Sequence, residues 1–261
     1  MTHWVQHIKA LLPKPFLRAI QKLKARRFRA RYAGWSTQEV FTQIYANGNW
    51  GKSVDPAQKF YSGSGSHDSA ALEAYAQAVQ VFLSGFAAKP KVLDLGCGDF
   101  AVGSRIRHLC GAYTAADIVA PLVTFNQEKY KALDVEFVVL DLITDPLPPA
   151  DIVFVRQVFQ HLSNDQIGRA LQKIVGQFRY LVLTEHLPHA GDSSASGAAG
   201  TFVANTDKPA GPETRLMLNS GVVLTEAPFH LKPASEQLLC RVADADGEIV
   251  SLAYALDPGK V

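Results

Sequence analysis

The sequence has little cysteine and lacks any long run of apolar residues. Its three cysteines, Cys97, Cys110 and Cys240, are odd in number and widely spaced. This pattern argues against a disulfide framework or a zinc motif and is typical of a reducing compartment. No stretch of about 18 apolar residues is present, so we predict no transmembrane helix. The start also lacks the apolar core of a secretory signal. We therefore predict a cytoplasmic protein.

Acidic residues are missing from the first 35 positions, which hold nine lysines and arginines. Of the 26 basic residues, 17 lie in the remainder of the chain, against all 24 acidic ones. The body of the protein is therefore acidic, which argues against nucleic acid as a partner. We interpret residues 1–35 as a basic amphipathic extension and residues 36–261 as one domain.

The extension permits three interpretations. Pro15 suits the first turn of a helix, and apolar residues lie along one side of it, with basic residues over the rest. Residues 1–32 could thus lie on an anionic membrane surface, which would place the protein peripherally at the inner membrane. A solvated helix that packs on the body or on a partner is the second interpretation. A mitochondrial transit peptide is the third, and the shortage of serine disfavours it.

The most informative stretch is Val92–Phe100, Val-Leu-Asp-Leu-Gly-Cys-Gly-Asp-Phe. Its apolar residues fit a strand of a parallel sheet that helices cover on both faces. Asp94 interrupts this strand, and a carboxylate there needs a partner. Ligands of open α/β sheets bind at the carboxyl ends of the strands. Gly96 and Gly98 allow a sharp turn and a close approach by a ligand.

This stretch resembles the first motif of the class I S-adenosylmethionine-dependent methyltransferases. It departs from the fuller Gly-x-Gly-x-Gly form, because Phe100 occupies the third glycine position. The resemblance covers the chain from about Asn49 to the end. It implies that Gly96, Cys97 and Gly98 contact the methionine part of the cofactor, largely through their backbone.

Two further strands end in acidic residues. Asp117 ends a predicted strand over 113–118, where a carboxylate accepts hydrogen bonds from both ribose hydroxyls of a nucleoside. A helix cap before Val119 is the alternative role for Asp117. Asp141 follows a predicted strand over 135–140. The resemblance implies that Asp141 receives the adenine amino group. It also implies that two neighbours of these carboxylates bind the cofactor, Leu142 beside the ring and Ile118.

The segment before the glycine motif contains a glycine- and serine-rich stretch, Ser62–Ser66. Its composition fits a flexible linker. Its position instead favours a lid, formed by residues 36–66, whose backbone amides bind a carboxylate. Both interpretations stay open. Apolar residues at helical spacing predict a helix over 69–86.

Residues 156–166, Arg-Gln-Val-Phe-Gln-His-Leu-Ser-Asn-Asp-Gln, follow a predicted strand over 151–155. They resemble the fourth-strand motif of a bacterial group of class I methyltransferases, many without an assigned substrate. We expect Arg156 and Gln157 to line the pocket near the transferred methyl. Ser163 and Gln166 form a capping box for the next helix. His161 is either a packed structural histidine or a catalytic base.

Glu185 and His186 end the fifth predicted strand, 180–184, and we expect both side chains to face the cleft. His186 is our first candidate for a catalytic base, since histidine titrates near neutral pH. His161 is the second, and Glu185 is expected to orient either of them. His186 and His189 alone are weak evidence for a metal, so we predict none.

Three residues are candidates for binding the acceptor: Trp50 in a turn, and Arg215 and Asn219 in an insertion. We predict that this insertion, 188–220, is mobile, because Gly191–Gly200 is rich in glycine, serine and alanine. Residues 205–229 are similar to the same bacterial group. Two strands, 237–242 and 249–255, flank a turn and predict a C-terminal hairpin.

We therefore predict an α/β fold with a doubly wound, mostly parallel, seven-stranded Rossmann-like sheet and an antiparallel C-terminal hairpin. The resemblance implies methyl transfer from S-adenosylmethionine to a small-molecule, glycan or lipid-linked acceptor, and we favour a hydroxyl. The first alternative is an NAD(P)-dependent oxidoreductase, because Gly96-x-Gly98-x-x-Ala101 fits that fingerprint. The second is a cofactor-binding protein without turnover.

Overall fold

The computed structural model describes residues 32–189, 202–244 and 247–257. The basic extension before Tyr32 and the glycine-rich run 191–200 lie outside these ranges, so the predictions made for them stay predictions. No helix within the described ranges has both the length and the apolar composition needed to cross a bilayer.

A single seven-stranded sheet forms the centre of the protein, in the order β3-β2-β1-β4-β5-β7-β6. The first five strands pair in parallel, whereas β7 pairs antiparallel with both β5 and β6. This arrangement confirms the predicted fold class, including the C-terminal hairpin. The strands are β1 (Val92–Leu95), β2 (Tyr113–Asp117), β3 (Glu136–Val139), β4 (Ile152–Arg156), β5 (Tyr180–Leu187), β6 (Ser235–Asp244) and β7 (Gly247–Ala255).

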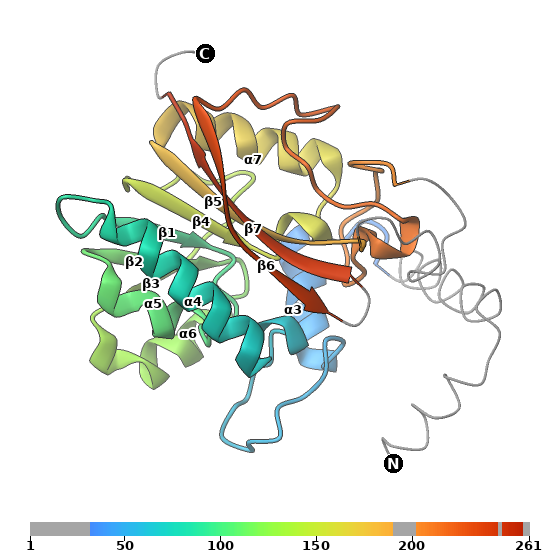
Figure 1. Ribbon diagram of the computed structural model, residues 1–261. Coiled ribbons are helices and arrows are strands. Elements are labelled where there is room, and N and C mark those ends of the chain that lie inside the picture. The colour runs from blue at the N-terminus through green and yellow to red at the C-terminus, as the bar shows by residue number, and fades with distance from the viewer. Residues whose placement is uncertain (1–31, 190–201, 245–246, 258–261) are drawn as a thin grey trace.

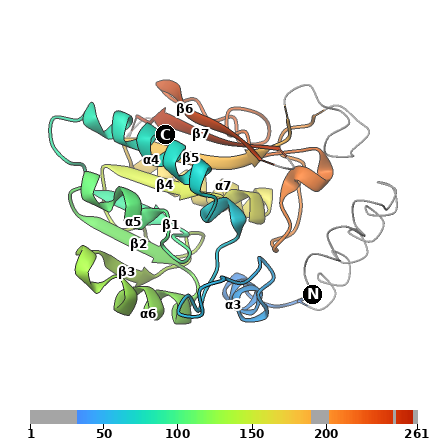
Figure 2. The ribbon, with the colours of Figure 1, turned by 60° about the horizontal axis from the view of Figure 1, so that its bottom comes forward.

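Helices cover both faces of the sheet, which explains why its central strands are mostly apolar. In Figure 1, α4 crosses one face of the sheet and α7 lies on the other. Figure 2 shows α5 and α6 near the β1–β3 side of the sheet, away from the hairpin. The helices are α3 (Thr37–Asn47), α4 (Ser69–Ser84), α5 (Gly103–Ile106), α6 (Ala120–Lys129) and α7 (Asn164–Gln177), with short 3-10 turns η1 (Ser64–Ser66), η2 (Arg107–Leu109), η3 (Lys131–Leu133), η4 (Phe159–His161) and η5 (Arg215–Leu218).

Local capping fixes the helix ends. Ser163 and Gln166 form the predicted capping box of α7, and Asp68 caps α4 through the backbone amide of Ala71 at 2.8 Å. Helix α4 ends before Gly85, two residues earlier than predicted. Helix α5, after the glycine turn, is short, because it gives way to the tighter η2 after one turn.

Helix α3 lies across the carboxyl ends of the strands. A capping box between Ser36 and Glu39 starts it, and its buried residues join the same core cluster as α7. The Gln38 amide donates to the backbone carbonyl of Ile118 at 3.0 Å, just beyond β2. The Gln166 amide donates to the Thr37 hydroxyl at 3.1 Å. These contacts place α3 over the edge of the sheet where ligands of α/β proteins bind.

The described part of the insertion is held by specific contacts. Asn205 is buried, its amide donates to the carbonyls of Val223 and Ala227, and its oxygen accepts from the amide of Val223, each at 2.8 Å. Asn205 thus ties its part of the insertion to the segment 223–227, and the mobility predicted for 188–220 stays a prediction. The glycine-rich run that motivated the prediction is not described.

Candidate functional site

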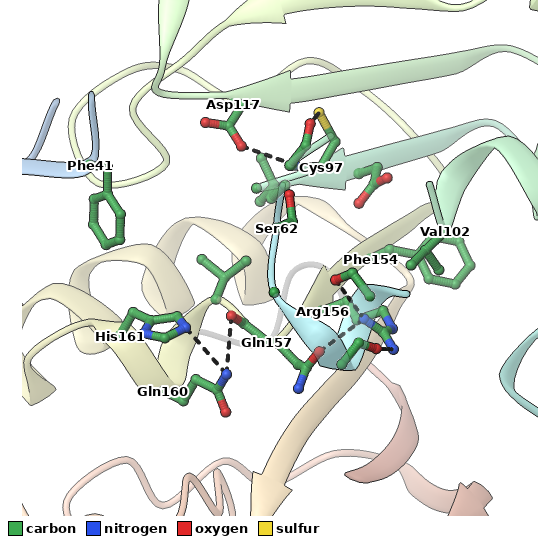
Figure 3. A pocket seen from close by; sticks show the side chains of 18 of the residues that line it. Phe41, Ser62, Cys97, Val102, Asp117, Phe154, Arg156, Gln157, Gln160 and His161 are labelled. Atoms are coloured by element: carbon green, nitrogen blue, oxygen red, sulfur yellow. Dashed lines mark hydrogen bonds between the residues drawn. The ribbon is translucent and has the colours of Figure 1, made fainter. Parts of the chain in front are cut away.

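A pocket of about 350 Å³ opens at the carboxyl ends of β1, β2 and β4. This volume lies in the usual range for small-molecule sites. All ten predicted cofactor-binding residues line it, as do three residues predicted for other roles, Trp50, His161 and His186. Figure 3 shows Asp117 and Cys97 on one side of this pocket and Gln160 and His161 on another. Among the predicted site residues that line the pocket, Trp50 and His186 are the farthest apart in the sequence, 136 positions.

The glycine turn after β1 is tied to its neighbours through the backbone. Gly96 and Gly98 have φ angles of +73° and +56°, which side chains rarely tolerate. The amides of Gly96 and Cys97 donate to the carbonyl of Ala116. The carbonyl of Gly98 accepts from the Asn126 amide of α6 at 2.7 Å. Burial raises the pKa of the Cys97 thiol well above its ordinary value, so the thiol is neutral here.

Phe100 replaces the third glycine of the motif at a similar backbone angle, φ +59°. Its ring is fully buried and packs edge-on against Tyr113, Tyr130 and Phe137. This aromatic packing offsets the cost of a left-handed conformation, which is of the order of 1–3 kcal/mol. A Cβ at Gly103 would lie 2.2 Å from the Phe100 ring, so the large residue at 100 requires the glycine at 103.

Three carboxylates face the same pocket. Asp94 accepts a hydrogen bond from the Tyr113 hydroxyl at 2.9 Å. Asp117 accepts from the amides of Gly98 and Val119, both at 3.0 Å, so it holds the glycine turn and also caps the following segment. Burial raises the pKa of both Asp94 and Asp117 to about 6. Asp141 accepts from the amide of Ile143 at 2.8 Å.

The Ser62–Ser66 stretch lines the pocket. Arg156, at the end of β4, donates to the carbonyl of Gly65 at 2.7 Å and to the hydroxyl of Ser66 at 3.3 Å. Its guanidinium also donates to the side-chain oxygen of Gln157 at 3.0 Å and lies over the Tyr75 ring. These contacts hold Ser62–Ser66 at the pocket. Of its two interpretations, they favour a lid over a flexible linker.

His161 is packed between other groups of the pocket wall. Its Nδ1 lies 3.2 Å from the carbonyl of Gly211, and its Nε2 lies 3.3 Å from the Gln160 amide. The Trp50 ring stands 5.2 Å from its own ring. Burial, together with the charge of Lys208, lowers the pKa of His161 to about 3. The imidazole therefore stays neutral at physiological pH and is poorly suited to accept a proton.

His186 lines the pocket beside a carboxylate of the hairpin. Its Nε2 lies 3.3 Å from Oδ2 of Asp244, which also lines the pocket. His186 belongs to β5 and Asp244 to the end of β6, with β7 between these strands. A Cβ at Gly247 would lie 2.2 Å from the Leu187 carbonyl oxygen and 3.2 Å from Nε2 of His186, so the turn requires a glycine there. The arrangement is that of a histidine paired with a carboxylate, a common form of general base.

Comparison with known proteins agrees with this geometry. Residues 92–179 match the family model described as a methyltransferase domain. The N-methyltransferase NodS from Bradyrhizobium japonicum WM9, in complex with S-adenosyl-L-homocysteine (SAH), aligns with a TM-score of 0.53 and 15% identity, over 85% of this chain and 99% of that chain. Magnesium protoporphyrin IX methyltransferase from Synechocystis PCC 6803, with bound S-adenosylmethionine, aligns with a TM-score of 0.53 and 13% identity, over 86% and 99%. No curated protein matches the sequence.

The chain carries a class I S-adenosylmethionine-dependent methyltransferase domain. S-Adenosylmethionine is therefore its cofactor, as predicted. The oxidoreductase alternative is wrong, since the glycine pattern that suggested it occurs here in a methyltransferase domain with an antiparallel hairpin. The second alternative, a cofactor-binding protein without turnover, gives way to a methyltransferase enzyme.

Glu185 does not face the cleft of this methyltransferase beside His186. Successive residues of a strand point to opposite faces, and of these two neighbours on β5 only His186 lines the pocket. Glu185 is buried and accepts from the amides of Phe159 and Gln160, each at 3.0 Å. Burial raises its pKa to about 8. Its contacts thus fix the η4 turn, and none of the described hydrogen bonds joins it to His161 or His186.

Arg215 and Asn219 do not line the pocket either. The Arg215 guanidinium is fully buried and donates to the carbonyls of Leu162 and Thr206. Asn219 is buried and ends η5 in a left-handed conformation. The insertion reaches the pocket through other residues, namely Pro212, Thr214 and Leu216. The predicted segment therefore lines the pocket, but not through the two side chains that were predicted.

Sequence reasoning missed Asp244, which lines the pocket, and two buried residues that hold segments lining it, Asn126 and Asp99. The sequence pattern places Asp244 in a hairpin turn and indicates no further role for it. Asn126 belongs to no motif and lies within a helix. Asp99, next to Gly98, is buried and binds the Ser62–Ser66 stretch. Each of the three finds its partner far away along the chain, so spacing alone gives no signal. No group of three metal-ligating side chains that could hold an ion occurs among the described residues.

Proposed function

We propose that the enzyme transfers a methyl group from S-adenosylmethionine to a hydroxyl of a small-molecule acceptor. The pairing of His186 with Asp244 at the pocket wall supports this proposal. A hydroxyl must lose its proton as the methyl arrives, and a general base contributes about 10²–10⁴-fold to such a step. In this proposal His186 takes the proton, and Asp244 stabilises the imidazolium that forms.

The bound cofactor supplies an activated methyl on its sulfonium. The protein therefore acts mainly by positioning, which contributes on the order of 7–11 kcal/mol to such reactions. We assign the ribose hydroxyls to Asp117, the amino group of the methionine part to Asp94 and the adenine amino group to Asp141. Gly96, Cys97 and Gly98 bind the methionine part through their backbone. Gln157 lies next to Arg156 near the methyl.

The acceptor side of the pocket is formed largely by aromatic and apolar residues: Phe41, Tyr45, Trp50, Leu162, Pro212 and Leu216. Such a wall favours an acceptor with an apolar part. The neutral His161 adds no charge to it. These features fit a phenol, an amphiphilic alcohol or a lipid-linked saccharide whose hydroxyl points toward His186.

A lipid-linked acceptor would also give the basic extension a role. Its nine basic residues without a single acid would attract an anionic membrane surface, at about 1 kcal/mol for each residue near the lipid. Co-sedimentation with anionic and neutral vesicles tests this part of the proposal. Equal sedimentation with both kinds of vesicle would contradict it.

The acceptor atom is tested with methyl-labelled S-adenosylmethionine and separate pools of phenols, alcohols, saccharides, amines and carboxylic acids. We expect label in the hydroxyl pools, in a product that survives mild alkali, as an ether does. Label only in amines would contradict the proposal. Label released by alkali would identify a methyl ester and contradict it as well.

A further inference from the structure

Asp99 is a buried carboxylate that lies outside the pocket. It follows Gly98 directly and is only 1% exposed. Its Oδ2 accepts from the backbone amide of Ser62 at 3.0 Å and lies 2.7 Å from Nε2 of His67. Its own backbone amide donates to the hydroxyl of Ser62 at 2.8 Å. A carboxylate is costly to bury. We therefore ask what Asp99 gains from its three contacts with Ser62 and His67, which lie far away along the chain.

The segment that Asp99 holds is Tyr61–His67, which we call the strap. The Tyr61 and His67 rings stack at 4.4 Å between centroids, which presents the His67 Nε2 to Asp99. The Ser62 hydroxyl also lies 3.0 Å from the Tyr45 hydroxyl of α3. A Cβ on Gly98 would come within 2.4 Å of that same hydroxyl oxygen. The strap thus lies directly on the glycine turn.

The strap also reaches the far wall of the pocket. Between its two ends, Ser62–Ser66 lines the pocket, and Arg156 binds the carbonyl of Gly65. A Cβ on Gly65 would come within 2.6 Å of the Gln157 amide oxygen. One short segment therefore joins the turn after β1 to the end of β4.

We propose that Asp99 is a positioning residue that fastens the strap across the methionine end of the cofactor site. Asp99 does not line the pocket. It acts through Ser62 and His67, which set the distance between the glycine turn and Arg156. This inference concerns cofactor binding alone and does not depend on which acceptor the enzyme uses.

The test measures SAH affinity by calorimetry and SAH dissociation by stopped-flow fluorescence. Asp99→Ala removes every side-chain contact to the strap, and hydrogen bonds to charged groups of this kind correspond to about 10- to 100-fold in affinity. We expect a weakening of that size, chiefly through faster dissociation. His67→Ala should weaken binding about 3- to 10-fold, since it removes one of these contacts. His67→Gln retains a donor at a similar reach and should restore most of the affinity.

Glu128→Ala is the matched control, because this carboxylate is exposed and pairs only locally with Lys131. It should bind SAH like the unaltered enzyme. Thermal unfolding of every variant separates positioning from general damage, and His67→Ala and Ser62→Gly carry the test if Asp99→Ala does not fold. Unchanged SAH binding in His67→Ala and Ser62→Gly would overturn the proposal. A loss in His67→Ala that His67→Gln does not rescue would overturn it too.

Discussion

His186 and Asp244 face each other across β7, with the Nε2 atom 3.3 Å from the Oδ2 atom. The antiparallel hairpin creates this pair, because it returns the chain beside the end of β5. The histidine side chain is mostly buried, whereas that of Asp244 is 42% exposed. A half-exposed carboxylate retains its hydration and still favours an imidazolium beside it.

We predict that His186→Ala lowers turnover about 10²–10⁴-fold, because it removes the proposed general base. SAH affinity should stay within about threefold, since the cofactor assignments do not involve His186. Asp244→Asn should lower turnover less, because the imidazole remains. Turnover under saturating acceptor and calorimetry with SAH measure the two effects separately.

His108→Ala is the control for the histidine substitution, because His108 is exposed and does not line the pocket. It should leave turnover unchanged. Full activity in His186→Ala would exclude the residue as the base. It would then favour an acceptor that needs no proton removal.

Arg215→Ala should affect stability and not the cofactor. It removes the donors of two backbone carbonyls, those of Leu162 and Thr206, and unsatisfied buried groups cost about 1–3 kcal/mol each. We expect the free energy of unfolding to fall by about 2–4 kcal/mol. Chemical denaturation measures this change. A loss of turnover with unchanged stability and unchanged SAH affinity would return Arg215 to the acceptor site.

The gathering of the predicted cofactor-binding residues in one pocket could be predicted from the sequence, because short-range patterns encode it. A buried strand, two glycines and acidic strand ends are local features, and the parallel sheet brings strand ends to one edge. Asp94, Asp117 and Asp141 therefore share one pocket as soon as the strand order is right.

The acceptor half was not readable in the same way, because tertiary contacts decide which side chains enter it. Arg215 and Leu216 are neighbours, yet only Leu216 lines the pocket. The distinction depends on carbonyls from other segments that capture the guanidinium. Glu185 is different, since the alternation of side chains along a strand already argued against its facing the same way as His186.

Cofactor affinity should depend on pH through Asp94. Burial raises its pKa to about 6 in the folded protein, so the empty site holds a neutral carboxyl below that pH. The ammonium and sulfonium of S-adenosylmethionine favour the ionised form. We predict that affinity rises as pH increases through 6 and that Asp94→Asn flattens this dependence. Calorimetry between pH 5 and pH 8 tests both expectations.

The stability of the cofactor-free protein should change in the opposite direction. The folded pKa of Asp94, about 6, lies above its ordinary value of 3.8, so between these values the folded state binds a proton that the unfolded state has released. The contribution of Asp94 to stability therefore falls as pH rises through this window, by up to about 3 kcal/mol. His161, whose pKa is lowered, has the opposite effect. Comparing the pH dependence of the free energy of unfolding between wild type and Asp94→Asn therefore isolates the contribution of Asp94. Equal slopes in the two proteins would contradict the raised pKa of Asp94.

Glycine-to-alanine substitutions should separate the glycine turn from the helices. Gly98→Ala meets both a φ of +56° and the Ser62 hydroxyl oxygen at 2.4 Å, so we predict a loss of SAH affinity of at least about tenfold, together with lower stability. Gly176→Ala lies in α7 with nothing within 4 Å of the new Cβ. It should raise the free energy of unfolding by about 0.5–1 kcal/mol, because alanine is the better helix former. Calorimetry with SAH and chemical denaturation test both variants. Equal effects of the two would show that the strap does not contact the glycine turn in solution.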